Sequence, residues 1–158
     1  MIKMIKNQKG FTLLELLVVI GIIGILVAIG SVSYSAAQTK SRDSRRRQDL
    51  EAVGKALEQY YVDNTTAKYS YPNDADCTGY SDYLSGDLPI DPKWGFVYTD
   101  SSANNKSGGS GAFCASTAFC VCVELESTNT GNAYGRSGTS CTWTGAGSKD
   151  YYCVQSKQ

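Results

Sequence analysis

The chain has 158 residues, in which 15 lysines and arginines balance 15 aspartates and glutamates, and it contains no histidine. This balance argues against the basic signature of a nucleic-acid-binding protein, and the lack of histidine excludes His-based triads and His metal sites. We find no paired carboxylates or activated nucleophile, so we expect no enzyme and no cofactor. Three of the lysines lie in the first ten residues, and removing them leaves 12 basic against 15 acidic side chains, a net charge of −3.

Residues 1–10 predict a targeting leader. Its lysines precede a long apolar run, and by the positive-inside rule they keep the amino end in the cytoplasm. A secretory signal peptide has a shorter apolar core that is followed by a small-residue cleavage site. Ala28 and Gly30 can mimic such a site, so this alternative stays open on the sequence alone.

Residues 11–30 predict a transmembrane helix. In this run Glu15 is the only charged residue, and at about 1.5 Å per residue the run spans roughly 30 Å, the thickness of a bilayer's hydrocarbon core. An acid inside a membrane segment is costly and usually has a partner. Glu15 therefore either lies near the membrane surface or pairs with a cation at the same depth. A new amino terminus at Phe11 of a neighbouring subunit would supply that cation.

The stretch KGFTLLELLVVIGIIGILVAI places Gly10, Phe11 and Glu15 at a fixed spacing beside the apolar run. It resembles the amino terminus of type IV pilins and of the related pseudopilins of type II secretion. The resemblance covers about residues 9–60. It implies that a prepilin peptidase cuts after Gly10 and methylates Phe11, and that Glu15 acts in assembly. It also implies an α+β pilin-like fold, with a long amino-terminal helix packed by its second half on a small antiparallel β-sheet head.

Residues 31–64 predict an amphipathic continuation, so that one helix runs from about 11 to 64. Small residues between Gly24 and Gly30 indicate either a segment that extends in a filament or a site of close helix packing. One buried stripe has a 3-4-3 spacing. It consists of Leu50, Val53, Leu57 and Tyr60. Three ion pairs at four-residue spacing support the opposite face. They are Asp43 with Arg47, Arg45 with Asp49, and Glu51 with Lys55.

Arg45, Arg46 and Arg47 form a short basic run. One hypothesis is a contact with acidic neighbours, lipid headgroups or DNA. The other is a solvated helix face that is paired with the nearby acids Asp43, Asp49 and Glu51.

Residues 65–158 predict a β-rich globular head. Residues 65–113 indicate a loop with short strands, in which Phe96 to Thr99 can begin a strand and Trp94 and Phe96 anchor the core. The segment 101–111 predicts a hairpin connection, and 127–149 a second loop. The clearest strand is 118–126, and 151–154 can close the sheet. In 118–126 alternate residues face the helix stripe, namely Phe119, Val121, Val123 and Leu125. Those facing away are Cys120, Cys122, Glu124 and Glu126.

Six cysteines in the head indicate disulfides formed in an oxidising compartment, and six cysteines allow 15 pairings. They are Cys77, Cys114, Cys120, Cys122, Cys141 and Cys153. Cys120 and Cys122 share a strand face, so we expect them to bond to different partners. Cys141 and Cys153 resemble a carboxy-terminal pilin disulfide loop. We expect no metal site, since Cys120-x-Cys122 lacks the usual zinc-site spacing.

These features predict a structural subunit that is held in the membrane as a prepilin, then processed and polymerised into a type IV pilus-like filament for adhesion, motility or DNA uptake. Alternatives are a type II secretion pseudopilin, a DNA-binding competence pilin and a plain signal-anchored surface protein. The expected partners are prepilin peptidase, other copies of the chain or minor pilins, an inner-membrane assembly platform and membrane lipid. Nucleic acid has only the arginine run in its favour. We expect a single pass through the cytoplasmic membrane with the head outside, and then a surface pilus or periplasmic pseudopilus.

Overall fold

The computed structural model describes residues 10–64, 69–74, 77–100, 110–137, 140–143 and 145–157. One long helix, α1 (Leu13–Asp63), is followed by a short 3-10 helix, η1 (Tyr80–Tyr83). The strands after it are β1 (Ser110–Ala115), β2 (Ala118–Glu124), β3 (Gly135–Ser137), β4 (Ser140–Thr142) and β5 (Tyr151–Gln155). The chain divides into two compact units, Met1–Gln38 and Thr39–Gln158, and α1 contributes to both. The expected α+β pilin-like fold is confirmed.

In the first unit α1 is apolar and its side chains are exposed. The most apolar 18 residues of the helix have a mean hydropathy of 2.8, and none of this window is buried. By length and composition the helix can therefore cross a membrane. The backbone between Gly24 and Gly30 is helical throughout. Every side chain described between residues 10 and 31 is exposed, so no other described residue covers this surface.

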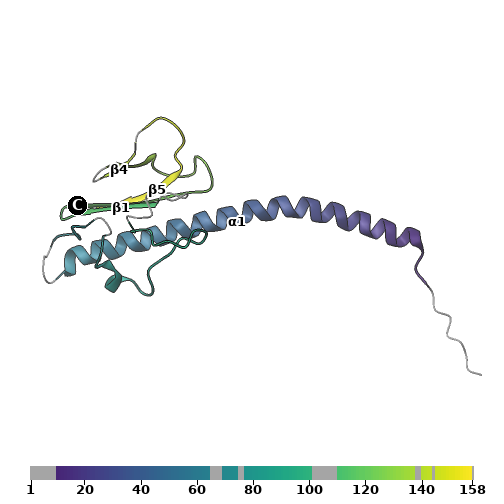
Figure 1. The fold of residues 1–158 in the computed structure, drawn as a ribbon, viewed down its shortest axis with the longest axis horizontal. Helices are drawn as coiled ribbons and strands as arrows, with labels where there is room; N and C mark the ends of the chain where they lie inside the picture. Colours follow the sequence, from purple (N-terminus) through teal and green to yellow (C-terminus); the bar gives the residue numbers. More distant parts are fainter. Residues whose placement is uncertain are drawn as a thin grey trace, which may run out of the picture. The chain divides into compact units, whose positions relative to one another are not determined.

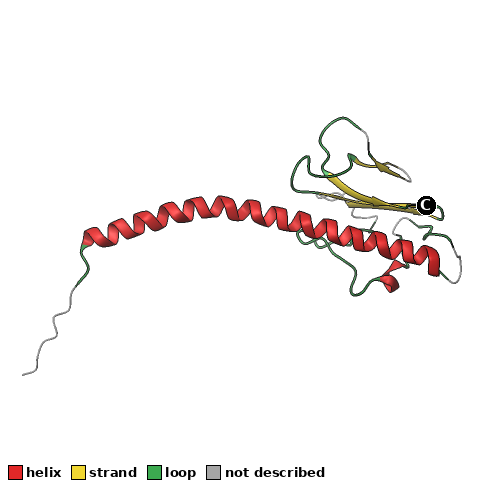
Figure 2. Cartoon of the chain, turned by 180° about the vertical axis from the view of Figure 1, so that it is seen from behind, coloured by secondary structure: helices red, strands yellow, loops and turns green. Residues whose placement is uncertain are grey.

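In the second unit α1 packs against the three-stranded antiparallel sheet, whose order is β1-β2-β5. Figures 1 and 2 show the sheet lying along one side of the carboxy-terminal part of the helix. Leu50, Val53 and Leu57 are fully buried, and they share one core with the apolar face of β2. The predicted stripe is confirmed for these three residues. Tyr60 is only half-buried and packs edge-on against Tyr83, with ring centroids 6.0 Å apart.

The alternation predicted for β2 is confirmed within the strand. Phe119 and Val121 belong to the core against α1, whereas Cys120 and Cys122 belong to a second buried cluster. The prediction is wrong for Glu126. The strand ends at Glu124, and the following turn brings Glu126 back to the helix side, where it pairs with arginines of α1.

Three features of the strands differ from the prediction. Strand β1 occupies the end of the expected loop region, and its register pairs Ala115 with Ala118 across a two-residue turn. The rest of the predicted 101–111 connection lies outside the described residues. The small hairpin β3–β4 lies within the predicted loop 127–149. Conversely, the strand expected at Phe96 to Thr99 is only an isolated bridge between Ile90 and Val97. The last strand, β5, is confirmed.

The loop that follows η1 covers the side of α1 opposite to the sheet, as Figures 1 and 2 show. Phe96 and Tyr98 are buried in the core, and Trp94 is half-buried and packs against it. The expected anchoring role of Phe96 is confirmed, and Trp94 takes part from the edge. The second half of α1 is therefore held between the sheet and this loop.

Candidate functional site

The amino-terminal site consists of the Gly10–Phe11 bond and the first turn of α1. Gly10, Phe11 and Thr12 precede the helix, which begins at Leu13. Gly10 is exposed, and the Phe11 side chain is 90% exposed. A peptide bond in an irregular, exposed segment fits a protease more readily than one inside a helix, because the enzyme needs access to the backbone. The structure thus leaves the expected cleavage bond accessible.

Glu15 has partners within its own chain. Its Oε2 accepts hydrogen bonds from the Thr12 backbone N–H at 3.1 Å and from the Thr12 hydroxyl at 3.0 Å. The Thr12 hydroxyl oxygen in turn accepts from the Glu15 backbone N–H at 3.2 Å. This reciprocal pattern is a capping box, which satisfies N–H groups at the start of a helix. Glu15 is therefore hydrogen-bonded to the start of its own helix.

Sequence reasoning missed this cap, although its signal was present. Thr12-x-x-Glu15 before an apolar run is the sequence signature of a capping box. The bonds involve Thr12 and Glu15 alone, so cleavage after Gly10 leaves them in place. A carboxylate that already accepts two hydrogen bonds costs less to bury than one without partners. The cap therefore makes it easier for an acid to reside near an apolar phase.

The arginine run is not a continuous basic surface. Arg46 is fully buried, and its guanidinium lies among three carboxylates. The Nε atom lies 2.7 Å from Asp91, and Nη1 lies 2.8 Å from Asp43 and 3.1 Å from Glu126. Trp94 stacks on the guanidinium, with its ring centroid 4.6 Å from Cζ. The expected solvated or ligand-binding face is therefore wrong for Arg46, although its pairing with the nearby acid Asp43 is confirmed.

Its two neighbours have separate contacts. Arg45 is largely exposed and lies 3.8 Å from Asp49, as predicted. Arg47 donates to the Thr130 carbonyl at 2.7 Å, instead of pairing with Asp43. The Asp43 pairing prediction is wrong because Asp43 turns inward.

The buried acids are satisfied by the backbone as well as by Arg46. Asp43 accepts from the N–H of Glu126 at 2.9 Å and from that of Ser127 at 3.0 Å. Asp91 accepts from the N–H groups of Lys93 and Trp94. Both carboxylates therefore tie a loop of the head to α1. A buried charge set of this kind keeps its place because each member has partners.

Glu126 is the most strongly perturbed acid of the cluster. Hydrogen bonds from Arg42 lower the pKa of Glu126 to about 2, against the opposing effect of burial. Lys93 and Arg46 contribute in the same direction. The Arg42 Nε lies 2.6 Å and the Lys93 Nζ 2.9 Å from this carboxylate. Glu126 is thus held as an anion well below the usual range of its type.

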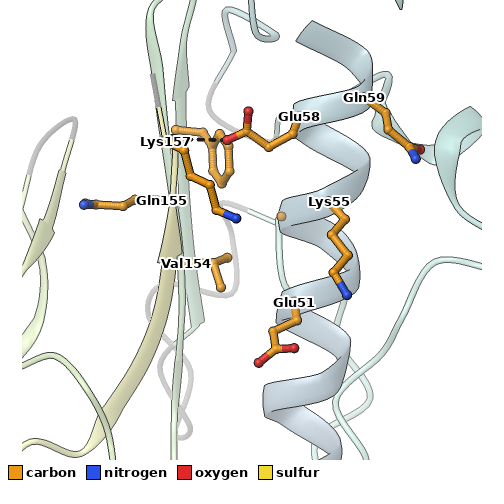
Figure 3. Close-up of a pocket in the computed structure, with 9 residues that line it drawn as sticks. Glu51, Lys55, Glu58, Gln59, Val154, Gln155 and Lys157 are labelled. Carbon is orange, nitrogen blue, oxygen red and sulfur yellow. Dashed lines mark hydrogen bonds between the residues drawn. The ribbon is translucent and has the colours of Figure 1, made fainter. Parts of the chain in front are cut away.

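The expected pair of Glu51 with Lys55 is not among the ion pairs of the described residues, since Glu51 instead accepts from the Tyr152 hydroxyl at 3.1 Å. Both residues line a cavity of about 540 Å³ between α1 and β5. Figure 3 shows Glu51, Lys55 and Glu58 on its helix side and Val154 and Lys157 on its sheet side. Glu58 accepts from the Lys157 backbone N–H at 3.0 Å. These contacts join the helix to the end of the sheet.

The six cysteines form three disulfides: Cys77–Cys114, Cys120–Cys141 and Cys122–Cys153. Cys120 and Cys122 do bond to different partners, as their shared strand face predicts. The expected disulfide between Cys141 and Cys153 is wrong, because each of these cysteines bonds to a cysteine of β2. Cys153 lies directly opposite Cys122 in the β2–β5 ladder, and this register brings those two sulfurs together.

Comparison with known proteins finds similarity in the same amino-terminal segment that contains Gly10, Phe11 and Glu15. Residues 5–31 match the family model described as the prokaryotic N-terminal methylation motif. The amino-terminal region is thus similar to that of type IV pilins and type II secretion pseudopilins. The type II secretion system core protein G of Pseudomonas aeruginosa is 32% identical over 68 residues, 43% of this chain and 45% of that protein. The type IV wide pilus major component PilA4 of Thermus thermophilus is 41% identical over 61 residues, 39% of this chain and 47% of that protein.

A longer match reaches into the head. A fimbrial protein of Pseudomonas aeruginosa is 29% identical over 105 residues, which are 66% of this chain and 58% of that protein. The pilin-like chain thus spans about half the length of the curated relatives it matches. No solved structure matches it.

The buried Arg46–Asp91 contact generates a stability prediction. We expect Asp91→Asn to lower the free energy of unfolding by about 3–5 kcal/mol, because it leaves the Arg46 charge buried with one partner fewer. Asp87→Asn is the matched control, since Asp87 is exposed in the same loop, and its effect should stay within about 0.5 kcal/mol. Urea unfolding of the full chain in detergent, followed by tryptophan fluorescence, measures both. Equal effects of the two substitutions would contradict the structural role of Asp91.

The lowered pKa of Glu126 generates a pH prediction. A depressed folded-state pKa adds stability above the unfolded value near 4.5, and this stability is lost as pH falls towards about 2. Glu126→Gln lacks this contribution. We therefore expect its free energy of unfolding to fall less than that of the wild type between about pH 5 and about pH 3. Parallel pH profiles for the two proteins would show that Glu126 is not held as described.

The disulfides generate a third prediction. Protein taken from the cell exterior should contain no free thiol, because all six cysteines are paired. Thiol labelling of unfolded, unreduced protein, with mass spectrometry, tests this. Two or more labelled thiols per chain would contradict full pairing, and a peptide joining Cys141 to Cys153 would contradict the observed connectivity.

Proposed function

We propose that this chain is a structural subunit of a type IV pilus-like surface filament, stored in the membrane as a prepilin. The observation that carries the proposal is the Gly10–Phe11–Glu15 spacing at the start of an apolar helix whose surface is uncovered. Within this proposal residues 1–10 are the leader, 11–30 the membrane and filament-core segment, 31–64 its amphipathic continuation and 65–158 the head. We expect no enzymatic activity from such a subunit.

The proposed sequence of events begins in the cytoplasmic membrane with the head outside. Prepilin peptidase cuts after Gly10 and methylates the new amino terminus at Phe11. An inner-membrane assembly platform then moves the helix from lipid into a bundle of like helices from other copies or minor pilins. This transfer keeps apolar surface out of water throughout. Heterologous contacts between copies do not close, so they generate a helical polymer.

Mass spectrometry of the mature protein tests the processing step. We expect a chain that begins with a methylated Phe11. An amino terminus at Met1, or one after Gly30, would reject the prepilin assignment and favour a signal-anchored or secreted protein.

A second candidate is a pseudopilin of a type II secretion system. It is favoured by the likeness to the protein named type II secretion system core protein G. The discriminating experiment locates the polymer by electron microscopy with labelled protein. Long filaments on the cell surface support the pilus, whereas protein confined to the periplasm and required for secretion supports the pseudopilus.

A DNA-binding competence pilin is less well supported than the arginine run alone suggests. Arg46 is buried, and Arg47 is engaged by a backbone carbonyl, so Arg45 is the one largely exposed member of the run. DNA affinity that falls steeply with salt would be needed to restore this alternative.

Glu15 generates the prediction that bears on assembly. We propose that its carboxylate also pairs with the Phe11 amine of an adjacent subunit, where a low dielectric strengthens the attraction and the pair sets axial register. Glu15→Val should leave leader cleavage and membrane insertion intact. It should reduce filament yield at least about tenfold, the change that follows from losing roughly 1.4 kcal/mol of docking free energy. Glu15→Asp should be intermediate, because it keeps the charge and loses reach.

The capping box supplies the matched control. Thr12→Val removes the hydroxyl that takes part in the cap, but it keeps the carboxylate of Glu15. If Glu15 acts on a neighbouring subunit, this variant should form filaments at close to the wild-type yield. Filament counts and membrane fractionation measure each variant. Loss of filaments in Thr12→Val equal to that in Glu15→Val would mean that Glu15 acts through the cap alone.

A further inference from the structure

Four of the six cysteines gather on the face of the sheet that points away from α1. Cys120, Cys122, Cys141 and Cys153 are all buried, and their sulfurs all lie within 4.8 Å of one another. The two disulfides therefore lie side by side. The Sγ of Cys122 is 3.6 Å from that of Cys120 and 3.8 Å from that of Cys141, although it is bonded to neither.

The backbone gathers these sulfurs independently of the bonds between them. Cys120 and Cys122 are alternate residues of β2, and Cys153 lies directly opposite Cys122 in the antiparallel β2–β5 ladder. The opposite face of β2 packs into the main core on α1. Three of the four side chains are thus placed by strand pairing and core packing. These forces remain when the sulfurs are reduced.

The fourth cysteine is placed by a hairpin with contacts of its own. Cys141 lies in β4, which pairs with β3. The Tyr134 N–H donates to the Thr142 carbonyl at 2.8 Å, and the Trp143 indole N–H donates to the Gln155 side chain at 3.0 Å. The first bond extends the pairing of β4 with the preceding strand, and the second ties the end of β4 to β5 without using sulfur. In a reduced head these contacts would keep the four thiols in one buried cluster.

The separations suit a tetrahedral thiolate site. Four sulfurs at about 2.3 Å from a zinc ion stand roughly 3.8 Å from one another. Two separations between unbonded sulfurs here are 3.6 and 3.8 Å. The spacing Cys120-x-Cys122 is short for a zinc site built on a loop, but on a strand it sends both sulfurs to the same face. The spacing argument against a metal therefore does not apply to this face of β2.

We propose that the head in its reduced state binds one thiophilic metal ion, such as zinc, through the sulfurs of Cys120, Cys122, Cys141 and Cys153. On binding, each thiol releases its proton to solvent and one sulfur–metal bond forms in its place. The same four sulfurs form the two disulfides, so the metal-bound and oxidised states exclude each other. The reduced head, before its disulfides form, is therefore the form that binds the metal.

The site has the dry surroundings of a structural metal centre. Ala133 is buried with the cysteines, and Tyr151 packs against the same cluster. The predicted consequence is that metal stabilises the arrangement of β2, β4 and β5 in the reduced head. Metal binding at this site does not require filament assembly.

The test uses the full chain in detergent, reduced with a phosphine under anaerobic conditions and titrated with cobalt(II) alone. We expect the absorption bands of tetrahedral thiolate cobalt, saturating at one ion per chain and abolished by one equivalent of zinc. The oxidised wild type should show none of these bands. Circular dichroism before and after titration reports whether the reduced head is folded.

Two double variants separate this cluster from cysteine content in general. Cys120→Ser with Cys141→Ser should lose the tetrahedral bands, whereas Cys77→Ser with Cys114→Ser should keep them. Both start from an unbridged chain, because reduction opens every disulfide in the wild type as well. The proposal is overturned if the reduced wild type shows no tetrahedral bands, whether or not it is folded. It is equally overturned if the two double variants bind cobalt alike.

Discussion

An apolar helix surface that cannot remain in water is the constraint on which the rest of the molecule depends. Between Leu13 and Ile29 the large side chains of α1 are exposed, and none of the residues that the structure describes covers them. Such a surface is stable only in lipid or against protein. Lipid covers this surface while the subunit is stored in the membrane, and the helices of other copies would cover it in a filament. The filament proposal therefore describes the transfer of the helix from lipid to protein.

Glu15, the acid within this surface, has one observed set of contacts and one proposed contact. Locally, Glu15 closes a capping box with Thr12 and so satisfies part of the helix start. In a filament it is proposed to meet the amine of a neighbouring Phe11. These functions are compatible, since a carboxylate has lone pairs for several donors. A partly satisfied acid is also less costly to hold in an apolar phase until a partner arrives.

In the head the same helix is buried by different means. Its stripe packs on β2, while Arg46 reaches Asp91 in the loop on the other side and Glu126 after β2. One buried cation thus connects the helix to both layers that enclose it. The disulfides Cys120–Cys141 and Cys122–Cys153 then fix the outer face of the sheet, where few large apolar side chains are available.

Sequence periodicity predicted the features that depend on local repetition. The length of α1, its stripe through Leu57 and the alternation within β2 all follow from spacing, and the structure confirms them. Spacing on α1 also suggested an exposed arginine run. The burial of Arg46 depends on Asp91 and Glu126, which lie 45 and 80 residues away, and no local pattern reports such contacts.

The remaining differences have similar causes. Strand β1 is short and rich in small residues, so it carries little β signal, and only its pairing with β2 defines it. The disulfide connectivity depends on strand register, which placed Cys153 opposite Cys122. The capping box is different, because the local pattern Thr12-x-x-Glu15 is sufficient to predict it. The apolar run beside it favoured a membrane role for Glu15, and the cap was not predicted.

Electron cryo-microscopy of filaments sheared from cells tests the central claim most directly. The account predicts filaments built from this chain, each copy beginning at Phe11. In their interior the apolar segments of α1 from adjacent copies should pack against one another, and the heads should face outward. Filaments in which these segments face solvent, or which retain residues 1–10, would contradict it. So would cells that express and process the chain while their filaments consist of another protein.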